Sequence, residues 1–258
     1  MNFLSLIGVE FRKIRRSQIL GILFAATVIL WIPSVINADL NFTIASWGIS
    51  TAPEYNFFIQ GFMGMAWFMF PGSMVVSTVL LIQTERGDHG LLKMLAMPIS
   101  TSRLCLAKFA VLLALAFSQV LMMTGMYYVS AAIASHTQNY AFILPPLYVF
   151  KEVLIIYLAA IPMLAFFWML AVCIRTPIFS VGIGLASIVP SVLAINTEVW
   201  YLYPMAYQFY VIANEQGRVT EGIAWTEFRW FPWIPAAAAI TAVCLLISCL
   251  QFGQAERR

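Results

Sequence analysis

Long apolar runs, separated by short polar segments, make up most of the chain. Six runs are long enough, at about 20 residues, to cross the roughly 30 Å hydrocarbon core of a bilayer as α-helices. They lie at about 19–37, 57–83, 107–133, 151–173, 177–196 and 232–251. Prolines interrupt several runs, which membrane helices tolerate when neighbouring groups satisfy the freed carbonyls. These prolines are Pro33, Pro71, Pro162 and Pro190. The pattern predicts an all-α, polytopic membrane protein with six transmembrane helices.

Composition supports this interpretation. Of the 258 residues, 62% are hydrophobic and 10% are charged, whereas a soluble domain carries about 25% charged residues. Too little polar surface remains to cover a water-soluble globule, so lipid must solvate much of the exterior. The first run follows basic residues, but it lacks a clear small-x-small cleavage site and five further runs follow it. A retained first helix therefore fits better than a cleaved signal peptide.

The distribution of lysine and arginine predicts the orientation, because these residues concentrate in cytoplasmic loops. With the N-terminus inside, the cytoplasmic side holds all of the 14 basic residues except Lys151, Arg218 and Arg229. The two sides then carry net charges of +7 inside and −4 outside, which together make the formal net charge of +3. We expect a protein of the bacterial cytoplasmic membrane with both termini in the cytoplasm, and no nucleic-acid partner.

Residues 1–17, which precede the first span, are basic and amphipathic. The apolar positions that recur at helical spacing are Phe3, Leu4, Ile7, Phe11 and Ile14. The polar positions that fall largely elsewhere are Asn2, Glu10, Lys13 and Arg16. A basic amphipathic helix beside a span is typical of a helix that lies in the inner membrane interface. An ordinary basic flank without a helix is the alternative.

The main cytoplasmic loop, about 84–106, holds a short apolar segment between helix breakers. Gly87 and Gly90 interrupt the preceding helix, and Pro98 ends the segment before Ser100 or Ser102 can cap the next helix. The segment itself contains Leu91, Leu92, Met94 and Leu95. These side chains need a place to be buried, either in the lipid interface or in a groove on a partner protein. The residues alone favour neither.

The motif in this loop consists of Glu85, Arg86, Gly90, Leu91, Leu92, Leu95, Pro98, Ile99, Ser100, Arg103 and Lys108. In this order it resembles the coupling-helix stretch of ABC-2 type permeases, the membrane subunits of ABC transporters. Asp88 and His89 depart from the pattern, since many members carry threonine or tryptophan nearer the leucines. The resemblance covers 1–258 as a single ABC-2 type transmembrane domain. It implies that Glu85 to Arg103 form an ATPase-coupling site.

Residues 198–231 are rich in tryptophan and tyrosine, which favour the membrane interface. A polar break around Asn214 to Gly217 predicts two short interfacial or re-entrant helices that flank a turn. The resemblance also implies a re-entrant segment before the last span, although a plain aromatic belt would account for many of the rings. The segment carries four glutamates, which are Glu198, Glu215, Glu221 and Glu227. They could attract a cationic amphiphilic peptide or form only a solvated rim.

The sequence lacks the common motifs of nucleotide-binding, hydrolytic and metal-binding sites. No GxxxxGK[ST] phosphate loop occurs, so the chain cannot hydrolyse ATP by that route. We expect no cofactor on this chain, with ATP and Mg bound by a partner ATPase. No HExxH, GxSxG or CxxC occurs, and His89 and His136 lie on opposite sides of the membrane, so we expect neither a metal site nor an enzyme. The spans contain essentially no charged groups, which disfavours a proton-coupled carrier.

Mildly polar and small residues inside the spans are candidates for two further roles. Gln60 and Gln119 should face other helices or a cavity, either as interhelical hydrogen-bonding groups or as contacts on a substrate path. Gly182, Gly184 and Ala186 make the fifth span smooth, and the small-xxx-small pair of Gly182 and Ala186 allows close helix approach. ABC-2 permeases pair partly through this span, so the resemblance implies a subunit interface there.

The leading hypothesis is a permease subunit of an ABC transporter that exports or expels an amphiphilic substrate. Overall likeness to lantibiotic self-protection and bacitracin-resistance permeases implies an antimicrobial peptide as the substrate. The partners would be cytoplasmic ATPase subunits and a second permease subunit, identical or related. The alternative is a non-transporting membrane scaffold or sensor that binds a cytoplasmic partner through the same loop. Co-purification with an ATPase and membrane-dependent ATP turnover would separate the two.

Overall fold

The computed structural model describes residues 3–14, 18–43, 51–86, 100–220 and 230–252. Helices are the regular secondary structure of these residues, and no strand occurs among them. Within these described ranges, six helical segments are long and apolar enough to span a bilayer. They are Ile19–Ile36, Pro53–Gln83, Thr101–Gln138, Pro146–Cys173, Pro177–Ala194 and Trp233–Phe252. The predicted all-α fold with six spans is confirmed, with boundaries that differ by up to about six residues from the expected ones.

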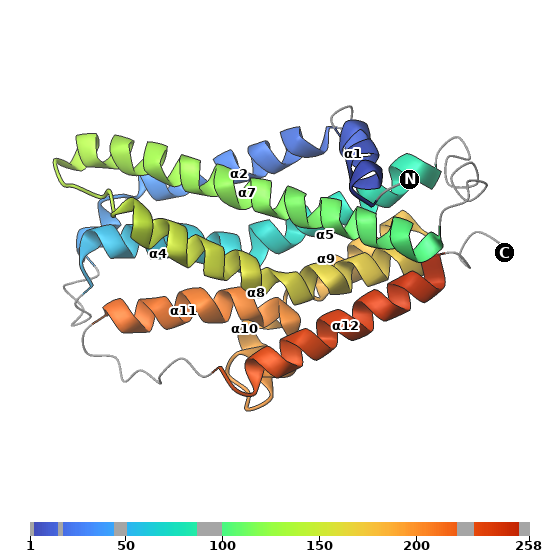
Figure 1. The fold of residues 1–258 in the computed structure, drawn as a ribbon. Helices are drawn as coiled ribbons and strands as arrows, with labels where there is room; N and C mark the ends of the chain where they lie inside the picture. The colour runs from blue at the N-terminus through green and yellow to red at the C-terminus, as the bar shows by residue number, and fades with distance from the viewer. Residues whose placement is uncertain (1–2, 15–17, 44–50, 87–99, 221–229, 253–258) are drawn as a thin grey trace.

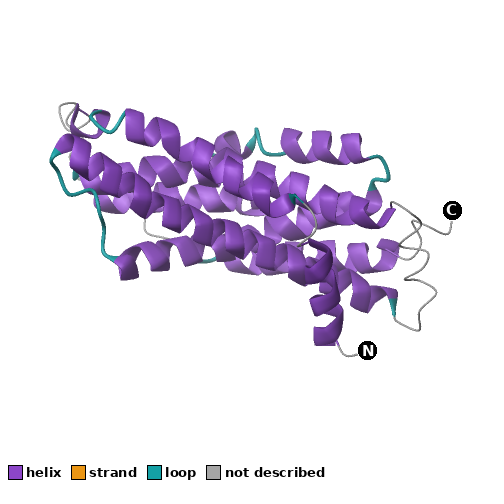
Figure 2. Cartoon of the chain, turned by 90° about the horizontal axis from the view of Figure 1, so that it is seen from above, coloured by secondary structure: helices purple, strands orange, loops and turns teal. Residues whose placement is uncertain are grey.

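The helices run back and forth along one axis, and Figure 2 shows that most connections lie at the two ends of the bundle. In chain order they are α1 (Phe3–Ile14), α2 (Ile19–Ile36), α3 (Leu40–Thr43), α4 (Pro53–Gly64), the π-helix η2 (Met65–Met69), α5 (Phe70–Arg86), α7 (Thr101–Gln138), α8 (Pro146–Cys173), α9 (Pro177–Ala186), α10 (Ser191–Ala194), the 3₁₀ turns η4 (Trp200–Leu202) and η5 (Pro204–Ala206), α11 (Tyr207–Val219) and α12 (Trp233–Phe252). We call the end that holds α1 the near end, and the opposite end the far end (Figure 1).

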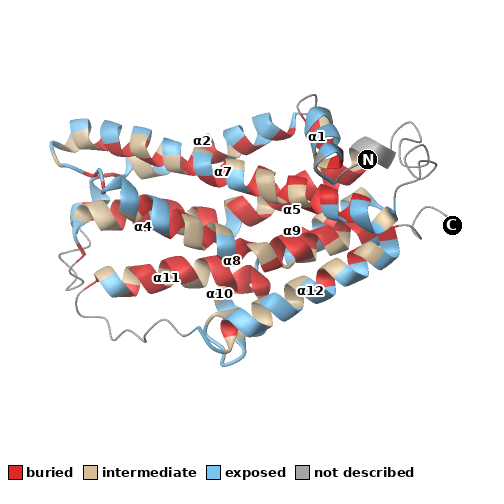
Figure 3. Ribbon diagram, viewed as in Figure 1, coloured by how far each residue is buried: buried red, intermediate tan, exposed pale blue. Residues whose placement is uncertain are grey.

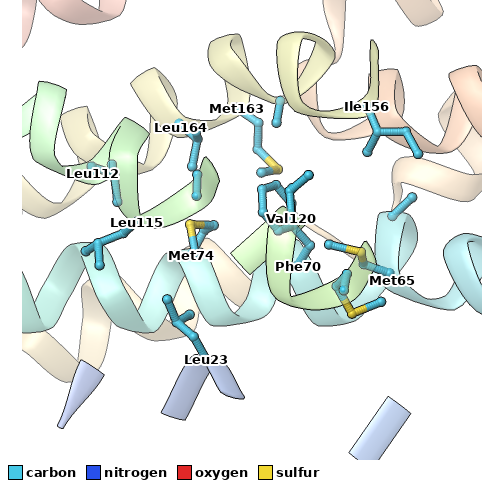
Figure 4. Close-up of a cluster of buried hydrophobic side chains, with 14 of the residues drawn as sticks. Leu23, Met65, Phe70, Met74, Leu112, Leu115, Val120, Ile156, Met163 and Leu164 are labelled. Carbon is cyan, nitrogen blue, oxygen red and sulfur yellow. The ribbon is translucent and has the colours of Figure 1, made fainter. Parts of the chain in front are cut away.

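The centre of the bundle is formed by α5, α7 and α8. Figure 4 shows Leu23 of α2, Met74 of α5, Leu115 of α7 and Met163 of α8 meeting there, and all four are buried. In contrast, α2, α9 and α12 expose most of their apolar side chains on the outside of the bundle (Figure 3). Because lipid tails are as apolar as leucine, these faces can remain in contact with a bilayer, and van der Waals packing holds the helices together.

The length of α7 exceeds what a bilayer requires. Its 38 residues correspond to about 57 Å at a rise of 1.5 Å per residue, against roughly 30 Å of hydrocarbon. Part of this helix therefore projects beyond the hydrocarbon region. At its far end, the hydroxyl of Tyr127 donates to the carbonyl of Phe142 and accepts from the amide of Leu144. These two bonds hold the turn between α7 and α8 against the bundle.

Close contact between α2 and α4 depends on a glycine. Trp31 is buried, and a Cβ built on Gly61 would overlap its indole ring. A larger residue at this position would therefore have to displace a rigid ring.

The four expected proline breaks have different outcomes. Pro33 and Pro162 lie inside continuous helices, and Pro71 lies in the first turn of α5, directly after the π-helix η2. Pro190 separates α9 from α10.

The polar break expected around Asn214 to Gly217 does not interrupt the chain. The helix α11 continues from Tyr207 to Val219 without a turn, so the prediction of two short helices in this part is wrong. Its polar residues are accommodated because one face of α11 packs on α8 and α4. On that face Glu215 accepts hydrogen bonds from Arg218 and Tyr148, which replace the water that a loop would have provided. Before α11, two 3₁₀ turns form the reversal of the chain.

The N-terminal helix forms as expected, but with a different buried face. Leu6, Glu10 and Ile14 are buried against the bundle, whereas Phe3 and Phe11 are exposed. The expected assignment of Glu10 to the solvated face is therefore wrong, because a lysine of α7 reaches it. The exposed phenylalanines remain available to a membrane interface.

Candidate functional site

Much of the predicted ATPase-coupling motif lies outside the described residues. This applies to Gly90, Leu91, Leu92, Leu95, Pro98 and Ile99. Glu85 and Arg86 form the last residues of α5, and their side chains are not described. Arg103 is exposed in the first turn of α7. Ser100 occupies the N-cap position of that helix, as predicted, although its side chain makes no capping hydrogen bond. The loop is thus anchored by the near ends of α5 and α7.

A buried ion pair joins α1 to α7 immediately beyond this loop. Lys108 Nζ lies 2.6 Å from Glu10 Oε2, and the two side chains are only 1% and 3% exposed. Lys13 Nζ, which is partly exposed, donates to the other carboxylate oxygen at 2.8 Å. Burial by itself would raise the pKa of Glu10, but the two lysines outweigh it and hold the pKa below the ordinary value. Glu10 is therefore ionised, and the pair fixes the N-terminal helix on α7.

Neither the amphipathic pattern of residues 1–17 nor the apolar pattern of the third span predicted this ion pair. Glu10 is the one acidic residue in a basic flank, and Lys108 is the one charge inside the apolar start of the third span. A charge isolated in an apolar helix needs a partner, and this requirement is the signal that could have found it.

A second polar link joins the two helices that flank the loop. Ser73 of α5 donates to Gln119 of α7 at 2.7 Å, and both side chains are buried. Gln119 thus makes the interhelical bond that one of the two interpretations predicted. Gln60 differs, because it is exposed on the surface of α4. Its side chain makes no interhelical bond within the described part of this chain, and the expectation that it faces another helix or a cavity stays a prediction.

The structure describes two of the four external glutamates, and these two differ in exposure. Glu198 is exposed, whereas Glu221 and Glu227 lie outside the described residues. Glu215 is buried and binds Arg218 through two hydrogen bonds of 2.8 and 2.5 Å. These bonds raise the pKa of the Arg218 guanidinium above its ordinary value. Glu215 is therefore already neutralised within the chain and is not a free partner for a cationic peptide.

The three predicted interface residues also separate into two groups. Gly182 and Ala186 are exposed on α9 and can meet a second subunit. Gly184 is buried, and a Cβ built on it would lie 2.7 Å from Cγ1 of Val75 in α5. Its assignment to a subunit interface is therefore wrong, because its lack of a side chain serves the packing of α9 on α5. Within the described ranges, no group of three or more His, Cys, Asp or Glu residues could hold a metal ion.

The six span-length helices found in the described part of the chain, with their mostly apolar outer faces, define a polytopic membrane protein. A family model described as "ABC-2 family transporter protein" matches residues 6–191. This match covers most of the chain, so the chain belongs to the ABC-2 transporter family. Members of the family are membrane permeases that work with a cytoplasmic ATPase, and this chain is accordingly a permease subunit of an ABC transporter. Searches of curated proteins and of solved structures gave no match.

Proposed function

We propose that this permease expels an amphiphilic substrate from the bacterial cytoplasmic membrane, driven by an ATPase that docks on the loop 84–106. The observation that carries the proposal is the pair of buried polar links behind the loop. Lys108 ties α7 to α1 through Glu10, and Gln119 ties α7 to α5 through Ser73. A movement of the loop would therefore displace three helices together. Such a connection suits the transfer of ATP-driven movement into the bundle.

The orientation in this proposal places the near end in the cytoplasm. Its support is the distribution of basic residues, because Arg12, Lys13, Arg103 and Lys108 all lie on α1 or the start of α7. The far end then faces outward, and it holds Glu54 in the first turn of α4.

A second permease subunit would complete the pathway. The exposed faces of α4 and α9 support this part of the proposal. Gln60 is a polar side chain on the outside of a span, where contact with lipid is unfavourable. Trp67 and Phe68, further along the same span, are also exposed. A face that combines aromatic rings with a single amide suits a substrate that is itself amphiphilic. An antimicrobial peptide, as in lantibiotic self-protection, is the substrate class that we propose.

The ATPase part is tested with two loop variants and one matched control. Leu92→Asp and Leu95→Asp should abolish co-purification of the ATPase, because a charge at these positions prevents burial of the leucines in its groove. Leu147→Asp makes the same change at an exposed position of the far end, and it should leave ATPase binding unchanged. Retention of the ATPase by both loop variants would contradict docking at this segment.

The transport part is tested in cells that carry this permease and its ATPase. Expression should raise the concentration of a lantibiotic needed to stop growth, and an inactive ATPase should abolish the effect. Gln60→Leu should reduce protection without reducing ATPase binding. If ATP turnover occurs in liposomes but protection does not depend on it, the chain is a scaffold or sensor and the export proposal fails.

A further inference from the structure

An apolar groove runs along the outside of the bundle where α8, α11 and α12 meet. Its volume is about 610 Å³, which lies in the range of ligand cavities. The side chains that line it are mainly apolar and include Ile155, Leu158, Pro162, Tyr207, Ile234 and Ala238. Leu158 and Ile234 are exposed, so the groove opens toward the surface that faces the bilayer. An acyl chain could enter it from the side.

A smaller cavity of about 250 Å³ continues the groove toward the far end. Ile155 and Trp230 line both spaces. The second cavity is charged, unlike the first, and its other lining residues are Lys151, Glu152, Val211, Asn214, Glu215 and Arg218. The two spaces together have an apolar body and a charged end.

The charged end contains two acidic and two basic side chains. Lys151 and Arg218 are 61% and 54% exposed, whereas Glu152 and Glu215 are buried. Arg218 neutralises Glu215. Glu152 approaches Lys151 only at 3.4 Å, which is longer than a charge-assisted hydrogen bond of about 2.7–2.9 Å. The cavity is thus neutral overall, with cations at its mouth and a weakly paired carboxylate inside.

Asn214 provides an independent indication of a ligand. This residue lines the cavity and is 8% exposed, and its side-chain Nδ2 has no hydrogen-bond acceptor among the described residues. A buried donor without an acceptor is unfavourable. An oxygen atom of a bound molecule would satisfy it.

We propose that the cavity and groove bind one zwitterionic aminophospholipid from the leaflet at the far end. Asn214 and Lys151 bind the phosphate oxygens, Glu152 accepts hydrogen bonds from the primary ammonium group, and an acyl chain occupies the groove. A zwitterion matches the balanced charge of the cavity, whereas an anionic headgroup would face two buried carboxylates. This inference does not depend on the proposed export, because the chain alone would hold the lipid without an ATPase.

The test uses the purified, delipidated full chain in detergent with an equal mixture of dioleoyl phosphatidylethanolamine, phosphatidylcholine and phosphatidylglycerol. Retained lipids are counted by native mass spectrometry. The parent should prefer phosphatidylethanolamine over phosphatidylcholine by about tenfold, because a quaternary choline has no N–H to donate. Glu152→Gln should remove this preference. Glu198→Gln, which makes the same charge change at an exposed position outside the cavity, should keep it.

A second pair of variants tests the groove. It leaves Glu152 unchanged, so it remains informative if Glu152→Gln destabilises the protein. Ala238→Trp should fill the groove and lower retention of phosphatidylethanolamine at least to the level of phosphatidylcholine. Ala239→Trp places the same ring at an exposed neighbour that does not line the groove, and it should retain the lipid as the parent does. Equal retention by these two variants, or no preference in the parent, overturns the proposal. Binding of free phosphoethanolamine that Ala238→Trp leaves unchanged would indicate a soluble ligand and would also overturn it.

Discussion

Lys108 and Glu10 are 98 residues apart in the chain, yet Nζ of the lysine lies 2.6 Å from a carboxylate oxygen of the glutamate. The pair joins the N-terminal helix to the helix that follows the coupling loop. Both partners are buried, so each depends on the other to offset its desolvation. Removal of either side chain would therefore leave the other charge buried without this partner and would destabilise the near end.

We expect Lys108→Met to destabilise the chain by about 3–5 kcal/mol, because it removes the buried lysine that binds the buried carboxylate of Glu10. The melting temperature in detergent should fall accordingly. Arg103→Met removes an exposed charge from the same helix and should change the melting temperature little. The double variant Glu10→Leu/Lys108→Met should recover much of the loss, and a strictly additive double variant would contradict a direct pair.

The same pair predicts a dependence of stability on pH. The pKa of Glu10 lies below its ordinary value of 4.5 in the folded chain. The stability that its ionised form contributes is therefore complete above pH 4.5 and is lost as the pH falls through the lowered pKa. Melting temperatures measured from neutral pH downward should fall more steeply in this acid range for the parent than for Glu10→Gln. Parallel curves for the two proteins would refute the linkage.

We expect Gly184→Ala to destabilise the chain by about 1–3 kcal/mol, because the added methyl group meets Val75 at 2.7 Å. Valine is stiff about χ1 and cannot easily turn away. Gly182→Ala is the matched control on the same helix, since a Cβ added there would meet nothing within 4 Å. That variant should be neutral or gain up to about 1 kcal/mol of helix stability. Equal effects in thermal unfolding would argue against close packing of α9 on α5.

Cysteine cross-linking tests the proposed subunit interface. In a background without the exposed Cys173, Gly182→Cys should form an oxidant-induced dimer in membranes, because Gly182 is exposed on the face that would meet a second copy. Ser180→Cys lies on the buried side of the same helix and should not cross-link. If Gly182→Cys is modified only by lipid-soluble reagents and never forms a dimer, a homodimer that pairs through this face is excluded.

The sequence by itself determined the six spans, the N-terminal helix and the membership of the ABC-2 family. Each depends on local information. An apolar run of about 20 residues has one stable form in a bilayer, because only a helix satisfies its own backbone there. The amphipathic pattern of 1–17 and the loop motif are likewise contained in short segments.

Only the tertiary structure decided which polar groups meet. Glu10 was expected on a solvated face, and Glu215 in an exposed acidic cluster, yet each is buried beside a basic partner. The sequence likewise did not show that Gln60 faces outward and that Gly184 faces inward. The physical reason is that apolar residues predominate on all faces of the spans, so the pattern of hydrophobicity does not tell the lipid-facing side from the packed side. Which side of each span is buried was decided by the packing of the helices on one another, in particular of α5, α7, α8, α9 and α11.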